Sequence, residues 1–360
     1  MSSEDYFNEY GPIQVHKHAL IKRYLDAWFP KIASFGKVVY METHAGRGIH
    51  KGGQPGSPIV AIQALLEHPQ SESILRKCQV HFYLMELREE YAQSLEKEIR
   101  ELAPHNDIKI SVARCDFAQK LEEELRLCEM SGKAMPPSFV FMDPFNYKIP
   151  MKLVKGVLKH RSCEVIMNFM ARNIAMAARD DSKKLLLDDL FGSDVWMQAK
   201  GVSDFDKQME SLVEIYKQAV GAKWTTKLRL TGQTDYTLMH FTNHDEGRVT
   251  MKTTIWALTG KYGKAGSEQL LVDDHPDQAI LVSQEPNLNP LEQRLRNDFL
   301  GKSFSYGELE KWLLSVNFLA KHLHNVLVTG RTEGWLETKH KKAFGPAMRE
   351  TMTVGPGTLL

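Results

Sequence analysis

The stretch Val38–Gly48, VVYMETHAGRG, decides how the rest of the chain is interpreted. Its first four residues predict a buried strand, and the acid Glu42 closes that strand. Two glycines, Gly46 and Gly48, then follow one residue apart. Glycine has no Cβ, so its backbone turns tightly and lets a ligand approach closely. The pattern predicts a ligand-binding loop at the end of a buried strand.

Further apolar stretches repeat this arrangement along the first half of the chain, and helical stretches separate them. Strands are predicted at residues 37–42, 78–86, 107–116, 137–145 and 163–170. Strands that are apolar throughout and alternate with helices are typical of a parallel sheet covered on both faces. We therefore expect an α/β fold with a doubly wound, mainly parallel sheet.

The second half of the chain changes character. A charged helical stretch from about residue 171 to 222 predicts an insertion between strands, and residues 236–258 predict an antiparallel pair around a turn at 245–247. Residues 273–290 contain three prolines and many polar residues, which is typical of a linker. We therefore expect a large domain over residues 1–285 and a small one over residues 286–360.

The small domain has the pattern of a winged helix-turn-helix. Three short helices are followed by a basic stretch at residues 334–344 that could form the wing. Ser305 and Glu308 have the spacing of a helix-capping box. Positive charge exceeds negative charge between Lys321 and Arg349, which fits either phosphate contacts or the docking of a protein.

The composition limits the function classes. The chain has 360 residues, 42% of them hydrophobic, and a formal net charge of +1, so any nucleic-acid surface must be local. Its four cysteines show no CxxC spacing, which predicts neither a zinc site nor disulfides and fits a reducing, cytoplasmic location. No apolar run approaches membrane-spanning length, so no membrane partner is expected. His44 and His50 flank the glycine loop, but no acid-His pair stands at ligand spacing, so no metal is expected.

Acids at successive strand ends indicate the ligand. Glu42 suits an ammonium group, Glu86 suits two ribose hydroxyls, and Asp116 suits an adenine amino group, with Phe117 beside the ring. Ligands of doubly wound sheets lie at the carboxyl ends of the strands, where these acids would meet. S-adenosylmethionine carries all of these groups and has no phosphate. The order of the acids therefore predicts S-adenosylmethionine as the cofactor.

The fourth strand is predicted to carry the chemistry. It ends in Asp143, Pro144, Phe145 and Asn146. Asp143 and the carbonyl of Pro144 could accept hydrogen bonds from an exocyclic amino group, which would direct the nitrogen lone pair at the methyl carbon. Phe145 could stack on the base, a contact worth about 1–3 kcal/mol. The alternative is that Asp-Pro only ends a strand and caps the next helix.

The whole chain resembles the three-Cys-motif partner proteins, a bacterial family of class I S-adenosylmethionine-dependent methyltransferases. The matching segments are KHALIKRYLDAW, THAGRG with the following GSP, MDPF, VIMNFM and YTLMHFTNHDEG. The resemblance implies a Rossmann-like class I methyltransferase fold, S-adenosylmethionine as cofactor, a C-terminal winged-helix segment and a three-Cys-motif protein as a partner.

Part of the chain also resembles the bacterial 23S rRNA adenine-N6 methyltransferases. Lys17 and His18 match a Lys-His pair on an N-terminal helix of that family, and Glu42 to Gly46, including His44, match its acid-Thr-His-Ala-Gly segment. Its catalytic motif is Asp-Pro-Pro-Tyr, so Asp143 and Pro144 match, whereas Phe145 and Asn146 replace the last two residues. From the residues alone, Lys17 and His18 could reach the cofactor carboxylate or lie on a solvated helix face.

Two classes of function follow. The first is an enzyme that methylates an exocyclic amino group in RNA or DNA, with adenine favoured. The second is a non-catalytic, cofactor-sensing adaptor that serves a three-Cys-motif partner enzyme, a reading that the Phe145-Asn146 departure supports. Methylation of a protein or a small molecule is a third alternative.

Overall fold

A computed structural model describes residues 10–102, 107–144, 148–232, 235–262, 264–271, 285–348 and 350–355. These residues form two compact units, which are described separately. The first falls within Met1–Thr254 and Glu268–Ala279, and the second within Ile255–Ser267 and Ile280–Leu360. Most of the predicted linker lies outside the described residues. No helix among the described residues is long and apolar enough to cross a membrane.

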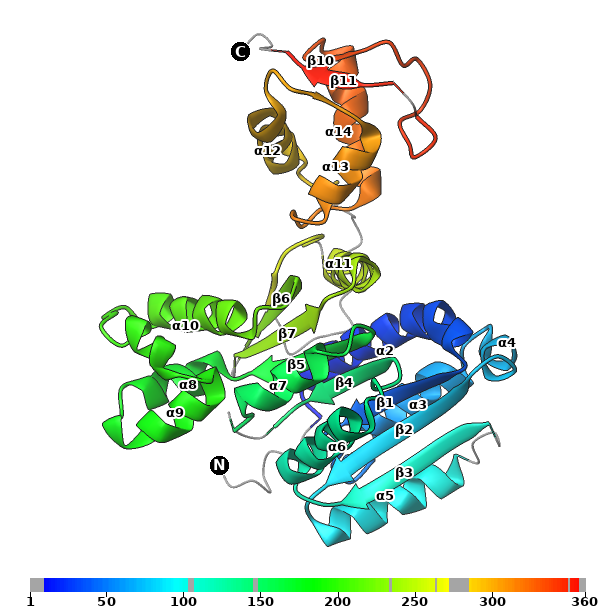
Figure 1. Ribbon diagram of the computed structural model, residues 1–360, viewed down its shortest axis with the longest axis vertical. Helices are drawn as coiled ribbons and strands as arrows, with labels where there is room; N and C mark the ends of the chain where they lie inside the picture. The colour runs from blue at the N-terminus through cyan, green and yellow to red at the C-terminus, as the bar shows by residue number, and fades with distance from the viewer. Residues whose placement is uncertain are drawn as a thin grey trace. The chain divides into compact units, whose positions relative to one another are not determined.

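The first unit is built on an eight-stranded sheet with the order β3-β2-β1-β4-β5-β7-β6-β8 (Figure 1). Its strands are β1 (Lys37–Glu42), β2 (Gln79–Glu86), β3 (Ile108–Arg114), β4 (Ser138–Met142), β5 (Cys163–Phe169), β6 (Trp224–Thr231), β7 (Tyr236–Thr242) and β8 (Gln269–Leu271). The first five strands are parallel, β7 runs antiparallel to both of its neighbours, and β8 pairs parallel with β6. The predicted α/β fold with a doubly wound, mainly parallel sheet is confirmed.

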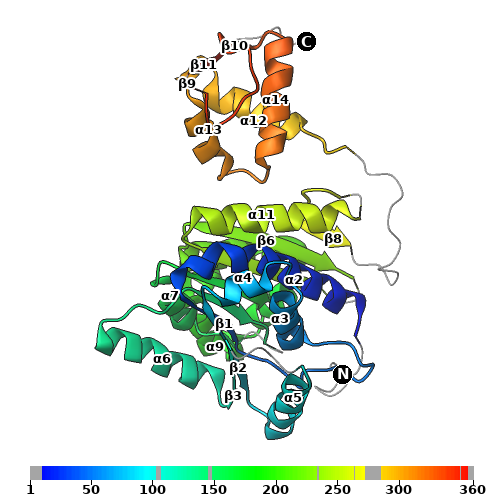
Figure 2. The same ribbon diagram turned by 90° about the vertical axis from the view of Figure 1, so that its right-hand side faces the viewer.

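Helices cover both faces of this sheet. Figure 2 shows α6 and α7 on one side and α2, α3 and α5 on the other. Their bounds, with the short α4, are α2 (Pro12–Ile32), α3 (Ser57–Leu66), α4 (Ser71–Leu75), α5 (Glu89–Glu101), α6 (Phe117–Ser131) and α7 (Met151–Leu158). Because both faces are covered, strands such as β4 and β5 are buried at every residue.

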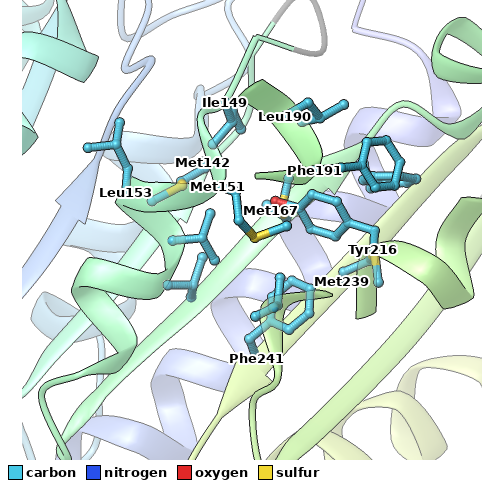
Figure 3. Packing of buried hydrophobic residues seen from close by; sticks show 14 of the residues in the cluster. Met142, Ile149, Met151, Leu153, Met167, Leu190, Phe191, Tyr216, Met239 and Phe241 are labelled. Atoms are coloured by element: carbon cyan, nitrogen blue, oxygen red, sulfur yellow. The ribbon is translucent and has the colours of Figure 1, made fainter. Parts of the chain in front are cut away.

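Successive side chains of each strand point to opposite faces of the sheet, so the apolar residues of the two faces pack separately. On the α6–α7 side, methionines and aromatic rings pack together, among them Met142, Met167, Met239 and Phe241 (Figure 3). The stretch from residue 171 to 222 adds α8 (Ala171–Ala178), α9 (Lys184–Phe191) and α10 (Phe205–Val220), whose apolar faces belong to the same core. The predicted helical character of this stretch is thus confirmed.

The predicted antiparallel pair around residues 245–247 is wrong. These residues begin α11 (Asp245–Gly260), and β7 instead pairs with β6. The Thr-rich sequence after the turn resembles a strand, but Met251, Ile255 and Leu258 are buried at helical spacing. Asp245 and Glu246 lie in the first turn, where acids stabilise a helix N-terminus.

The second unit contains three helices and a small sheet around its own core. The elements are α12 (Asn289–Phe299), β9 (Ser303–Phe304), α13 (Tyr306–Leu313), α14 (Ala320–Thr332), β10 (Leu336–Thr338) and β11 (Met352–Val354). The strands form an antiparallel sheet in the order β10-β11-β9. The predicted capping box at the start of α13 is confirmed, with Ser305 and Glu308 each bonded to the other's backbone.

Candidate active site

A pocket in the first unit lies where β1, β4 and β5 end and β7 begins. Its lining residues come from α2, from the loop after β1 and from these strand ends: Gln14, Lys17, His18, His44, Ala45, Gly46, Arg47, Gly48, Ile49, His50, Gly56, Ser57, Asp143, Pro144, Asn168 and Tyr236. Seven predicted site residues are among them: Lys17, His18, His44, Gly46, Gly48, Asp143 and Pro144. The carboxyl ends of parallel strands are where doubly wound folds bind ligands.

Asp143 lies at the centre of a buried polar cluster in this pocket. One of its carboxylate oxygens contacts the Lys17 ammonium, and the other accepts a 3.1 Å hydrogen bond from Asn168 Nδ2. Lys17 is only 4% exposed and His18 only 5%, so the expectation of a solvated helix face is wrong. Helix α2 packs over the sheet here and directs both side chains inward.

The loop after β1 is fixed by Glu86 at the end of β2. The backbone amides of Gly46 and Arg88 each donate a 2.9 Å hydrogen bond to the Glu86 carboxylate. Gly46 and Gly48 have φ values of 66° and 88°, a left-handed conformation that favours glycine. A Cβ on Gly48 would also come within 3.1 Å of the Leu95 side chain. Glu86 therefore shapes the loop while its oxygens retain lone pairs for a ligand.

Glu42 lies beneath the pocket and does not line it. The carboxyl group is fully buried, with hydrogen bonds from Tyr40 Oη at 2.9 Å and from Ser57 Oγ at 2.5 Å. Burial raises the pKa of Glu42 to about 8, although both hydrogen bonds oppose the rise. Ser57 is the first residue of α3 after the N-cap Gly56, and its hydroxyl is directed at Glu42.

His44, Phe117 and Asp116 lie at the neighbouring edge of the site. The ring centroids of His44 and Phe117 are 4.6 Å apart, and Thr43 Oγ1 lies 2.7 Å from His44 Nδ1. Burial lowers the pKa of His44 to about 4, despite the opposing charges of Asp143 and Asp116. Asp116 caps α6 by accepting hydrogen bonds from the backbone amides of Ala118 and Gln119 at 2.9 and 3.0 Å.

Phe145 and Asn146, the last two predicted catalytic residues, lie outside the described residues. Nine lining residues were not predicted from the sequence, and two of these lie on strands, Asn168 on β5 and Tyr236 on β7. A signal for Asn168 was present, because a lone amide interrupts the apolar run VIMNF. Among the residues that the structure describes, no group of three or more His, Cys, Asp or Glu side chains could hold a metal.

Comparison with known proteins finds only distant structural likenesses to this chain. No family model and no curated protein matches it. Protein LPL1258 from Legionella pneumophila is similar at 17% identity and a TM-score of 0.39, over 67% of this chain and 90% of that one. SAH-bound methyltransferase PaMTH1 from Podospora anserina has 9% identity and a TM-score of 0.31, with coverages of 62% and 87%.

The hMettl16 catalytic domain, solved in complex with a 3'UTR hairpin, is similar at 9% identity and a TM-score of 0.28, with coverages of 63% and 71%. These likenesses are distant, so the fold is defined by the chain's own strand order. The order β3-β2-β1-β4-β5-β7-β6, with β7 reversed, gives the doubly wound, mainly parallel sheet expected from the sequence.

Proposed function

We propose that the protein is an S-adenosylmethionine-dependent methyltransferase. One observation carries the proposal: a single pocket at the strand ends joins the glycine loop after β1 to Asp143 and Pro144 after β4. The first group of residues suits a cofactor and the second suits a reacting amino group. These two groups of residues are far apart in the sequence, and the fold brings them into one pocket.

The chain's residues would divide the binding of the cofactor among them. Gly46 and Gly48 allow close backbone approach, and Lys17 and His18 face the carboxylate end. Glu86 accepts the ribose hydroxyls, whereas Asp116, Phe117 and His44 border the adenine. Glu42 contributes indirectly by holding Ser57 at the pocket wall. When bound, S-adenosylmethionine supplies a methyl group on a positively charged sulfur, which leaves as a neutral thioether.

The group that receives the methyl is proposed to be an exocyclic amino group of a nucleic-acid base, with adenine favoured. Asp143 and the Pro144 carbonyl would accept its N–H hydrogens, and Phe145 and Asn146 would contact the base. Held in line at about 3 Å from the methyl carbon, the nitrogen needs little further activation. Its proton leaves to solvent after the N–C bond forms. The second unit, with three helices and a small antiparallel sheet, would act as a winged helix that grips RNA or DNA.

The Lys17–Asp143 ion pair favours one second candidate. An ammonium group already contacts the carboxylate that the chemistry needs. In an adaptor, this pair would be permanent, and the fold would sense the cofactor for a three-Cys-motif partner protein. In the enzyme, the arriving amino group would compete with Lys17 for Asp143.

Calorimetric titration with S-adenosylmethionine and S-adenosylhomocysteine tests the cofactor assignment. We expect micromolar binding by the wild type, loss of binding in Glu86→Ala, and no change in Glu89→Ala. Glu89 is the matched control, since it is an exposed acid three residues away that pairs with Arg114. Radiolabelled methyl transfer to total RNA and to DNA then separates the enzyme from the adaptor. Absence of binding to either ligand contradicts the proposal.

A further inference from the structure

The wall of the pocket opposite the glycine loop contains an amide that the fold does not need. Asn168 is 2% exposed, lies on β5 opposite Leu238 of β7, and lines the pocket together with Tyr236. Every residue of β5 is buried, and an apolar side chain would suit such a strand better than an amide. A buried amide at this position therefore requires an explanation beyond packing.

The orientation of the amide follows from its neighbours. Asp143 accepts from Lys17 through one oxygen and from Asn168 through the other, at 3.1 Å. A carboxylate only accepts hydrogen bonds, so the NH2 side of Asn168 must face Asp143. The amide oxygen is then fixed on the other side and cannot exchange places with the nitrogen without losing this contact.

That oxygen has no partner. Asn168 Oδ1 is buried and accepts no hydrogen bond from any described residue. An unmet buried acceptor costs about 1–3 kcal/mol, and native proteins retain few of them. Because Asn168 borders the pocket, a ligand carrying an N–H group can relieve this cost.

We propose that Asn168 positions and selects the amino group that receives the methyl, its Oδ1 accepting an N–H beside Asp143. The inference rests on the methyltransferase function proposed above. An amino group has two N–H hydrogens, so Asp143 would accept one, and Asn168 Oδ1 and the Pro144 carbonyl would share the other. A carbonyl oxygen in the same place would face the lone pairs of Asn168 Oδ1 and of the Asp143 carboxylate. The site therefore favours bases with an exocyclic amino group over bases with a keto group.

Nucleoside binding at saturating S-adenosylhomocysteine tests the inference, because the cofactor product blocks its own site. The probes are adenosine against inosine and cytidine against uridine, which exchange an amino for a keto group, followed by ligand-observed NMR. We expect the wild type to prefer the amino member of at least one pair by about tenfold or more. In Asn168→Leu, the preference should fall by about fivefold or more, while affinity for S-adenosylhomocysteine is retained.

Asn243→Leu is the matched control, since Asn243 donates a 2.9 Å hydrogen bond to Leu158 O and does not line the pocket. Asn168→Val, which suits a strand, is used if the leucine variant does not fold. An unchanged preference in a folded Asn168 variant overturns the inference, as does a wild type without any preference. Loss of S-adenosylhomocysteine binding in the variant overturns it too, since Asn168 would then serve the cofactor. If the wild type itself binds no S-adenosylhomocysteine, the proposed function fails first.

Discussion

Helix α2 reaches the sheet with two side chains that are two turns apart, and the two contacts have different surroundings. Lys17 contacts Asp143, beside Asn168, while Tyr24 donates its hydroxyl to Glu164, which also lies 2.7 Å from His240 Nε2. Each cluster contains a buried atom without a hydrogen-bond partner among the described residues, Asn168 Oδ1 in one and His240 Nδ1 in the other.

Access to a ligand distinguishes the two clusters. Lys17, Asp143 and Asn168 border the pocket, whereas Tyr24, Glu164 and His240 line no part of it. An unmet hydrogen bond therefore indicates a ligand only where there is room for one. We interpret the Lys17 cluster as functional and the Tyr24 cluster as structural, and the predictions below test that division.

The largest expected effect is on catalysis. Asp143→Asn removes the carboxylate charge, and we expect methyl transfer to fall by about 10²–10³-fold, the loss typical of one positioned electrostatic group. Affinity for S-adenosylhomocysteine should stay within a few fold. Turnover is measured with radiolabelled methyl donor, and Asp188→Asn is the control because Asp188 pairs with Lys184 away from the pocket. Unchanged turnover would remove Asp143 from the mechanism and erase the distinction between the clusters.

In the Tyr24 cluster we expect a substitution to lower stability and to leave cofactor binding unchanged. Glu164→Ala leaves the buried Tyr24 hydroxyl and His240 without their acid, so the free energy of unfolding should fall by about 3–5 kcal/mol. Urea unfolding measures this change, and the folded fraction should bind S-adenosylhomocysteine as the wild type does. A stable Glu164→Ala variant that has lost cofactor binding would show that this cluster, too, is functional.

Glu42 is a third buried acid, and it extends the comparison to the pH dependence of the free energy of unfolding. Its pKa of about 8 lies above the ordinary 4.5, so the folded state keeps a proton that the unfolded state releases. The contribution of Glu42 to the free energy of unfolding is thus fully present below pH 4.5. It is lost as pH rises towards 8, by about 1.4 kcal/mol per unit of pKa difference. Glu42→Gln should abolish this decline and be the more stable form at pH 8. Unfolding curves between pH 5 and 8 that have equal slopes in both proteins would contradict the buried neutral acid.

Tyr24→Phe has the smallest expected effect. It removes one hydrogen bond to the charged Glu164 carboxylate, which should cost about 1.5–3 kcal/mol of unfolding free energy. Burial acts to raise the pKa of Glu164, but the bonds from His240 and Tyr24 outweigh it and lower the pKa. This contribution is present above pH 4.5 and is lost as pH falls through the lowered value. The variant should therefore differ from the wild type least in acid, as followed by thermal unfolding from pH 3 to 7.

The sequence was most informative where a pattern is local. Apolar strands, the glycine loop and the Ser305 capping box were all read correctly from short segments. The strand predicted after residue 247 is wrong because threonines favour strands, whereas Met251, Ile255 and Leu258 are buried at the spacing of a helix.

The candidate site, too, has features that the sequence could predict and others that only the fold shows. The positions of Lys17 and Asp143 could be marked as candidates, but their contact joins residues 126 positions apart. Ser57 shows no role in the sequence, and only the fold brings its hydroxyl to the Glu42 carboxyl. Asn168 and Tyr236 were missed because single residues in apolar strands show their role only when the pocket beside them is known.

The crossing of α2 has a consequence for how the chain is made. Tyr24 finds its partners on residues that lie 140 and 216 positions later in the sequence. On a ribosome that adds about 5–20 residues per second, helix α2 must therefore wait on the order of ten seconds or more before β7 has been synthesised. During that interval α2 can already contact rings on earlier strands, since Phe29 lies beside Phe82 of β2 and Trp28 beside Phe139 of β4. Helix α2 thus completes its contacts only after β7 has been made, although it precedes every strand of the sheet in the sequence.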